Sequence, residues 1–441
     1  MHRIGMVSGI IVIGLAACAR AQQPAPAADS ARGTIGPRAV VRPGITVLLQ
    51  DSMSLIAGKR VGLLTNQSGI DEHGTSDIDL LYQYEARDSG AHSRGPRLVA
   101  LFSPEHGIRG TEDHPNIADG RDARTGLPIF SLYGATALAP PDSALRRLDA
   151  LIIDLQDLGT RTWTYVASMV YAMRSAARHH LPVIVLDRPN PITGLHVEGP
   201  LLDTALAYAG TTSPTHRANP VGLYPIPLRH GLTMGELARF YNDVLHLHAD
   251  LHVIPASGWH RGMWFDQTGL PWVKPSPNMP SLTSALLYPG LVMFEATNLS
   301  VGRGTPDAFQ HVGAPWLDAT RAVALLNERH LAGVRFVPER FTPHAPTDHK
   351  YGGRTIPGIR IVVTDRDSVQ SVRVGAAILW AVVKTARGSL RVRDAAFDMR
   401  LGAPAARTAL LAGADPDSVL ARYAPAAAAF TARTRRYYLY R

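Results

Sequence analysis

The sequence predicts an α/β fold: a Rossmann-like, mainly parallel sheet domain followed by a second, smaller α/β domain. Apolar runs of strand length alternate with helical stretches through the first part of the chain, and each run is apolar throughout. Such continuous runs are typical of strands buried on both faces, as in a parallel sheet covered by helices on each side. The 441 residues exceed what one ordinary core holds, so we expect two domains.

The expected elements follow from hydrophobic spacing. The strands of the first domain are expected at 61–65, 98–102, 128–134, 150–157, 183–187 and 251–255. Helices are expected around 77–86, over 165–178, where apolar residues recur at helical spacing, and from the capping-box pair Thr233 and Glu236 to about Val244. In the second domain we expect a strand at 359–364, a helix near 372–384, and Glu295 in an apolar strand.

Composition and short motifs predict where the signal peptide, the tether and the two domains begin and end. Residues 1–18 have a basic start, an apolar core and the lipobox-like sequence LAAC, so we expect a lipoprotein signal peptide with Cys18, the chain's single cysteine, as the lipidation site. The alternative is a plain secretory signal with a chance cysteine. Residues 19–43, rich in Ala, Pro, Gln and Gly, are expected to be a flexible tether, followed by the Rossmann-like domain at 44–272 and the C-terminal domain at 273–441. The protein would then be exported and anchored to a membrane, facing the periplasm or the cell exterior.

Composition and missing motifs exclude several functions. The net charge of +9 comes mainly from scattered arginines, without a basic stripe, which does not favour nucleic-acid binding. No G-x-G-x-x-G follows the first strand, so no dinucleotide cofactor is expected. The sequence also lacks G-x-S-x-G, which counts against a serine esterase.

Polar residues follow four of the expected strands. Because the carboxyl ends of parallel strands share one edge of a sheet, where ligands bind, we expect these residues to line one polar cleft. They are Asn66 and Gln67; Glu105 and His106; Asp154, Gln156 and Asp157; and Asp187, Arg188 and Asn190. Each residue alone is an ordinary turn former or helix cap. Asp154 and Asp157 could suggest a metal, but histidines at ligand spacing are missing, so no metal is expected.

Later segments add further candidates, each with an ordinary alternative. Asn278, Glu295 and Arg303 are candidates from the second half, although Glu295 could be a paired structural carboxylate. Arg303 or Arg161 could grip a ligand carboxylate with two hydrogen bonds, or could form a surface ion pair. Five aromatic residues could stack on sugar faces or could belong to the core, namely Trp163, Tyr165, Trp259, Trp272 and Trp316.

Taken together, long motifs from about residue 45 onward resemble the NamZ-type exo-β-N-acetylmuramidases. The motifs are GLLTNQSG (62–69), LFSPEHGIRG (101–110), SLYG (131–134), DLQDLGTRTWTYV (154–166), LDRPNPITG (186–194), VEGPLLD (197–203), PIPLRHGLTMGELA (225–238), PSPNMPS (275–281), LLYPGLVMFEATNLSVGRGT (286–305) and GAPW (313–316). One departure is Trp163, where the family more usually has Phe or Tyr. The resemblance implies a cleft between the two domains and release of terminal N-acetylmuramic acid from the non-reducing ends of peptidoglycan fragments, without a cofactor.

The resemblance also implies roles for the residues. Glu105 matches the family's catalytic glutamate and would act as general acid, and His106 would tune or orient it. On chemical grounds, Asp154 or Asp157 could activate water, or the substrate's own acetamido group could attack with an aspartate steadying it. We also expect Arg161 or Arg303 to bind the lactyl carboxylate of the muramic acid. The remaining substrate-binding candidates are Asn66, Gln67, Arg109, Gln156, Tyr165, Arg188, Asn190, Asn278 and Glu295. The alternative hypothesis is a lipoprotein that binds muropeptides without turnover.

Overall fold

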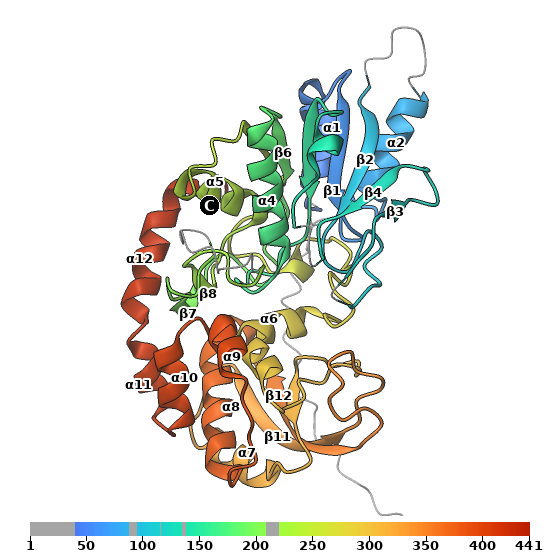
Figure 1. Cartoon of the computed structure of the whole chain (residues 1–441). Coiled ribbons are helices and arrows are strands. Elements are labelled where there is room, and N and C mark those ends of the chain that lie inside the picture. The colour runs from blue at the N-terminus through green and yellow to red at the C-terminus, as the bar shows by residue number, and fades with distance from the viewer. Residues whose placement is uncertain (1–39, 88–94, 115, 135–137, 209–219) are drawn as a thin grey trace, which may run out of the picture. The chain divides into compact units, whose positions relative to one another are not determined.

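The computed structural model of the chain describes residues 40–87, 95–114, 116–134, 138–208 and 220–441 (Figure 1). The predicted signal peptide, Cys18 and the predicted tether up to residue 39 lie outside the described residues. In the part of the chain that the structure describes, no helix combines the length and the apolar character needed to cross a membrane.

A seven-stranded sheet with the order β3-β4-β2-β1-β5-β6-β9 forms the centre of the first half of the chain. All neighbouring strands run parallel except the edge pair β3 and β4, which confirms the predicted Rossmann-like sheet. The strands are β1 (Arg60–Thr65), β2 (Arg97–Ser103), β3 (Gly120–Arg121), β4 (Pro128–Ser131), β5 (Ala150–Asp154), β6 (Val183–Leu186) and β9 (Leu251–Ile254). The chain order reverses between β1 and β5, and in open α/β sheets ligands bind outside the carboxyl ends of strands at such a point.

Helices cover both faces of this sheet, as the continuously apolar strands require (Figure 1). The helices of this half are α1 (Gly44–Asp51), α2 (Asp77–Arg87), α3 (Asp142–Leu145), α4 (Tyr165–Arg178) and α5 (Met234–Val244). Successive residues of one strand face opposite sides: Ile152 of β5 packs in a cluster with α1 residues, whereas Ile153 belongs to the cluster that contains α4 and α5. The predicted capping box at α5 is present, with the Thr233 and Glu236 side chains each accepting from the other's backbone N–H.

The second half contains a smaller antiparallel sheet with the order β10-β12-β11, flanked by helices, which confirms the second α/β domain. Its strands are β10 (His311–Gly313), β11 (Val334–Phe341) and β12 (Ile356–Val363). Its helices are α6 (Leu282–Leu291), α7 (Ala319–Asn327), α8 (Ser371–Thr385), α9 (Asp394–Leu401), α10 (Pro404–Leu411), α11 (Pro416–Ala421) and α12 (Ala424–Thr434). A separate two-stranded antiparallel sheet pairs β7 (Glu198–Leu201) with β8 (Pro227–Arg229). Short 3-10 helices complete the fold: η1 (Met53–Leu55), η2 (Phe265–Gln267), η3 (Val292–Ala296), η4 (Arg366–Ser368) and η5 (Arg435–Tyr437).

The expectation that Glu295 lies in an apolar strand was wrong. Glu295 lies in η3, directly after α6, and both elements are buried nearly throughout. The reason is the close crossing of α6 and α8, where an added Cβ at Gly290 would lie 1.9 Å from the Ser371 carbonyl oxygen. A helix enclosed on every side is apolar all round, and its sequence therefore resembles that of a buried strand.

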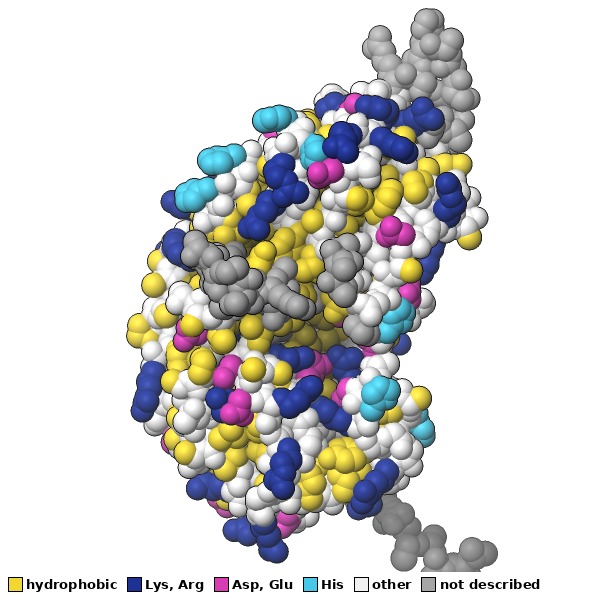
Figure 2. Space-filling view, viewed as in Figure 1, with side chains coloured by type: hydrophobic (Ala, Val, Ile, Leu, Met, Phe, Trp, Pro, Cys, Tyr) yellow, Lys and Arg dark blue, Asp and Glu magenta, His cyan; other side chains and the backbone are white. Residues whose placement is uncertain are grey.

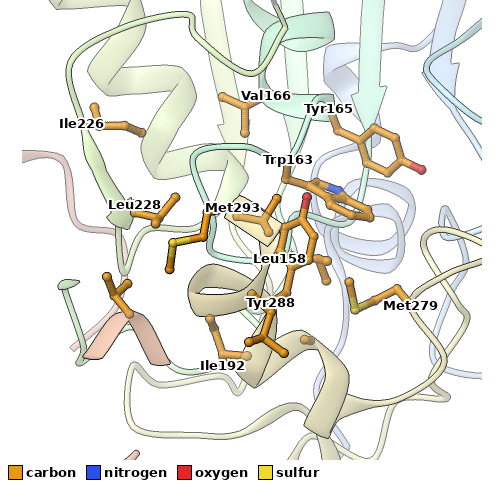
Figure 3. Packing of buried hydrophobic residues seen from close by; sticks show 14 of the residues in the cluster. Leu158, Trp163, Tyr165, Val166, Ile192, Ile226, Leu228, Met279, Tyr288 and Met293 are labelled. Atoms are coloured by element: carbon orange, nitrogen blue, oxygen red, sulfur yellow. The ribbon is translucent and has the colours of Figure 1, made fainter. Parts of the chain in front are cut away.

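The largest buried cluster joins the two halves. Side chains from α4, α6 and η3 meet in it; among those labelled in Figure 3, Trp163 packs edge-on against both Tyr165 and Tyr288. The cluster also contains Met293 of η3. The two sheets therefore belong to one compact unit, and residues from both can form a single site.

Both ends of the described chain pack against the first sheet's domain. Val41, which falls in the segment predicted as a tether, is fully buried, and its N–H bonds to the Thr268 carbonyl, so the folded part begins before Gly44. At the other end, the Tyr440 hydroxyl donates to Asp187 Oδ2 (2.7 Å). The residues at the end of the predicted second domain thus complete the packing of the first.

Candidate active site

The turn after β2 places Glu105 at the carboxyl end of the sheet. Pro104 follows the strand directly, and His106 then adopts a φ of 72°, which is uncommon for a residue other than glycine. The buried His106 ring is held from the loop side, with Nδ1 2.6 Å from the Glu112 carbonyl oxygen and 3.7 Å from Asp113 Oδ1. These contacts connect the turn that carries Glu105 to the loop at Glu112 and Asp113.

A hydroxyl group holds the half-buried Glu105 side chain, and a phenol lies near it. Thr164, which precedes α4, donates from Oγ1 to Glu105 Oε2 at 2.5 Å. Tyr133, just beyond β4, lines the same cavity as Glu105. Burial and the negative charge of Glu105 raise the pKa of Tyr133, which keeps its phenol protonated. Residues from three strand and helix ends thus converge on one carboxyl group.

Glu105 faces a cavity of about 250 Å³. Its lining residues are Glu105, Asp113, His114, Tyr133, Glu295, Arg303, Thr347, Asp348, Arg393 and Arg400. Figure 2 shows a hollow in this face of the molecule, with basic and acidic side chains gathered along its lower edge. Since the lining comes from both halves of the chain, the predicted cleft between the domains is present.

Several predicted residues of the second half meet in this cavity. Glu295 Oε1 accepts from Arg303 Nε (3.0 Å) and Nη2 (2.5 Å), and Glu295 Oε2 lies 3.3 Å from Arg400 Nε. Burial disfavours the charge on Glu295, but the two arginines outweigh it and hold the pKa of Glu295 below its usual value. Asn278 donates to Asp113 Oδ2 at 2.7 Å. Glu295 is therefore both a paired carboxylate and part of the cavity wall.

The structure does not place Asp154 in the cavity. This last residue of β5 is fully buried and forms a bidentate ion pair with Arg188, which is also buried and donates to the Ile70 carbonyl oxygen. Burial and the charge of Asp154 raise the pKa of the neighbouring Asp77 well above its usual value. An acid enclosed in this way cannot reach a water molecule beside a bound sugar, so the assignment of Asp154 to water activation is corrected to a structural one.

Asp157 is likewise internal, 2% exposed, with Oδ2 accepting from Gly159 N (2.6 Å) and lying 3.4 Å from His230 Nε2. The other polar residues at the strand tips mostly bind neighbouring loop backbone. Gln156 donates to the Asp157 and Pro189 carbonyls, Asn190 to the Leu232 carbonyl, Gln67 to the Lys274 carbonyl, and Asn66 accepts from Ser68. These residues assemble the loops beneath the site and do not line the cavity.

Three further predicted ligand contacts have other partners. Arg161 is buried and donates to the carbonyl oxygens of Val221, Met399 and Arg400, and burial lowers its pKa to about 10. The Tyr165 hydroxyl is buried and donates to the Pro275 carbonyl. Arg109 pairs with Asp122 in the loop that follows β2. None of the three lines the cavity, so their assignment to substrate contact is corrected.

Seven lining residues were not among the sequence candidates. They are Asp113, His114, Tyr133, Thr347, Asp348, Arg393 and Arg400. Tyr133 and the contacting Thr164 stand in the SLYG and TWTY motifs, which was the available signal for both. Across the described ranges, no group of three or more His, Cys, Asp or Glu side chains is arranged to hold a metal ion.

Fold and site together define a two-domain α/β enzyme with a carboxyl group in a polar cleft, the arrangement that acid-assisted hydrolysis requires. Family models described as exo-β-N-acetylmuramidase NamZ, N-terminal and C-terminal, match residues 61–283 and 286–440. The chain belongs to the NamZ family of exo-β-N-acetylmuramidases.

Relatives agree with this assignment over nearly the whole chain. The peptidoglycan β-N-acetylmuramidase NamZ of Bacillus subtilis (strain 168) is 38% identical over 402 residues, 91% of each chain. A crystal structure of a DUF1343 family protein from Bacteroides fragilis is 33% identical with a TM-score of 0.80, covering 92% of this chain and 100% of that one. A second DUF1343 family structure from the same organism is 27% identical with a TM-score of 0.68, over 91% and 99%.

Proposed function

We propose that this protein is an exo-acting glycoside hydrolase that releases terminal N-acetylmuramic acid from the non-reducing ends of peptidoglycan fragments. Membership of the NamZ family and the similarity to the Bacillus subtilis peptidoglycan β-N-acetylmuramidase support the reaction class. The observation that carries the proposal to this chain's residues is Glu105, held by Thr164 and placed near Tyr133 at the wall of a polar cavity of about 250 Å³.

Glu105 is proposed as the general acid. A glycosidic oxygen needs a proton as its bond to the sugar breaks, and a carboxylic acid beside that oxygen supplies the proton. The hydrogen bond from Thr164 restrains one carboxyl oxygen of Glu105, so the group is oriented before the substrate enters. His106 fixes the turn on which Glu105 stands.

The second catalytic role has two candidates. In one, a cavity carboxylate activates water on the opposite face of the sugar; Asp113, Glu295 and Asp348 are the acids in the lining besides Glu105. Two arginines lower the pKa of Glu295, which makes this carboxylate a weaker base than it would be without them. In the other, the acetamido group of the substrate attacks and a carboxylate steadies it. Proton NMR of the first-formed anomer separates them, since water attack inverts the configuration and acetamido attack retains it.

The test is hydrolysis of MurNAc-GlcNAc or of a chromogenic muramide by wild type and Glu105→Gln. We expect free N-acetylmuramic acid from the wild type and a loss of about 10²–10⁴-fold in the variant, with unchanged circular dichroism. Glu328→Gln, an exposed glutamate after α7, is the matched control and should retain full activity. Binding of muramyl sugars without product, unchanged in Glu105→Gln, would instead identify a non-catalytic peptidoglycan-binding lipoprotein.

We also propose that the protein is exported and anchored to a membrane through lipid on Cys18. The support is the basic start, apolar core and LAAC sequence of residues 1–18. Expression of wild type and Cys18→Ala in a bacterial host tests the proposal. Wild type should label with a fatty acid and sediment with membranes, whereas the variant should do neither; equal labelling of the two proteins contradicts the assignment.

A further inference from the structure

This inference rests on the proposed function and concerns how the site selects its sugar. N-Acetylmuramic acid differs from N-acetylglucosamine by a lactyl ether that ends in a carboxylate. A site selective for that group needs a cation whose hydrogen-bond donors are not all used by the protein's own acceptors. The cavity offers three arginines, namely Arg303, Arg393 and Arg400.

Arg303 is the least available of the three. Its Nε and Nη2 both donate to Glu295 Oε1, at 3.0 and 2.5 Å. Its Nη1 lies 3.5 Å from Asp113 Oδ2 and 3.3 Å from Thr347 Oγ1. All three guanidinium nitrogens therefore have protein acceptors, and the side chain holds Glu295 and Asp113 in place.

Arg400, in the last turn of α9, is differently placed. Its Nε lies 3.3 Å from Glu295 Oε2 and its Nη1 3.2 Å from the Ala396 carbonyl oxygen. Among the described residues, no acceptor lies within hydrogen-bond distance of its Nη2, although the side chain is only 23% exposed. Arg393, at the start of α9, donates to the Glu295 carbonyl oxygen from Nη2 (2.9 Å). Both arginines thus present donors to the cavity from the side formed by the second domain.

In the state in which Glu105 carries the proton that it is proposed to donate, the charge in the cavity leaves one cation unmatched. The other lining acids are Asp113, Glu295 and Asp348, and Asp348 is matched by Lys350 at 3.5 Å. The two other acids face three arginines. A ligand with one carboxylate would balance this charge, and desolvation inside the cavity would strengthen that interaction.

The position of Arg400 is fixed from the first domain. Arg161 donates to the Met399 and Arg400 carbonyl oxygens at 3.0 and 2.8 Å, which satisfies the C-terminal end of α9. Gly402 follows with a φ of 95°, and an added Cβ there would lie 2.8 Å from Arg161 Nη2. The arginine predicted to bind the lactyl carboxylate thus holds the helix that carries Arg400.

We propose that Arg400, assisted by Arg393, binds the lactyl carboxylate of the terminal N-acetylmuramic acid and so determines the specificity of the site. A sugar in the cavity then has its glycosidic oxygen at Glu105, on the side of the first sheet, and its lactyl group toward α9. Arg303 serves the site by ordering Glu295 and Asp113.

The test compares two substrates that differ only in this charge: 4-nitrophenyl N-acetylmuraminide and its lactyl methyl ester. The readout is the ratio of kcat/KM for acid over ester. Wild type should favour the acid, and Arg400→Gln should reduce the ratio about 10- to 100-fold, the size expected for losing one charge-assisted hydrogen bond. Arg400→Lys should recover part of the ratio. Arg335→Gln, an exposed arginine on β11, is the matched control.

An unchanged ratio in Arg400→Gln overturns the inference, and so does an equal fall for acid and ester, which would indicate a structural role. If wild type cleaves neither substrate, the proposed function fails, and calorimetric binding of N-acetylmuramic acid and its methyl ester decides the inference alone. Preferential binding of the acid by wild type, lost in Arg400→Gln, supports it; equal binding of the two sugars by wild type overturns it.

Discussion

Replacing Asp154 by Asn tests whether this residue is structural or catalytic. Its carboxylate receives two donors from Arg188, Nε on one oxygen and Nη2 on the other at 2.8 Å, and the two side chains are 0% and 4% exposed. Asn keeps the shape and one acceptor but removes the countercharge, so the buried Arg188 guanidinium is left with neutral acceptors, the Asn oxygen and the Ile70 carbonyl at 2.8 Å. Breaking one side of a buried pair costs about 3–5 kcal/mol.

Urea unfolding followed by circular dichroism measures this cost. With a slope of about 3 kcal/mol/M, the midpoint of the transition that includes the first domain should fall by about 1 M or more. Asp149→Asn is the matched control at the other end of β5, since Asp149 pairs with Arg60 at 2.9 Å while both side chains are 41–48% exposed. Its cost should stay within about 1 kcal/mol. Asp154→Asn with wild-type stability and abolished turnover would refute the structural assignment.

Two further predictions concern stability. Gly402→Ala forces an alanine into a φ of 95° beside Arg161 Nη2, so we expect a loss of about 1–3 kcal/mol in urea unfolding and a reduced acid-over-ester ratio; wild-type values of both would contradict the role given to this turn. Burial raises the pKa of Asp187 from 3.8 to about 7, so the folded state holds a proton that the unfolded state releases. This contribution to stability is complete below about pH 4 and is lost as the pH rises through about 7. Asp187→Asn should therefore flatten the fall in unfolding midpoint between pH 5 and 8, and an identical pH profile in both proteins would count against it.

The fold of the first domain could be predicted from the sequence because its strands are apolar on both faces. The predicted strand at 61–65 corresponds to β1 (Arg60–Thr65), and the helix expected at 165–178 is α4 (Tyr165–Arg178). The second domain was predicted less completely, because enclosed elements such as α6 and η3 carry no amphipathic pattern that separates helix from strand.

Of the polar residues predicted at the strand ends, Glu105 faces the cavity and Asp154 does not, and the difference lies in where each stands relative to the end of its strand. Glu105 stands two residues beyond the end of β2, where the chain has already turned, and it faces the cavity. Asp154 is still the last residue of β5, and its side chain is fully buried against Arg188. The hydrophobic pattern of a strand does not show whether a polar residue near its end faces the cavity or the core. Arg400 could not be predicted from the sequence for another reason. It joins the cavity through a contact with Glu295, which lies 105 positions earlier in the chain.

The contact between Tyr440 and Asp187 affects the order in which parts of the molecule can fold. These two residues are 253 positions apart, and Leu439 N also bonds to Glu236 Oε1 in the first domain. During synthesis the amino-terminal sheet emerges long before these partners exist, although domains generally fold in the order of their appearance. The contacts of Tyr440 with Asp187 and of Leu439 with Glu236 can therefore form only after nearly the whole chain has been synthesised. A fragment cut between the two domains would leave Asp187 and Glu236 without these contacts.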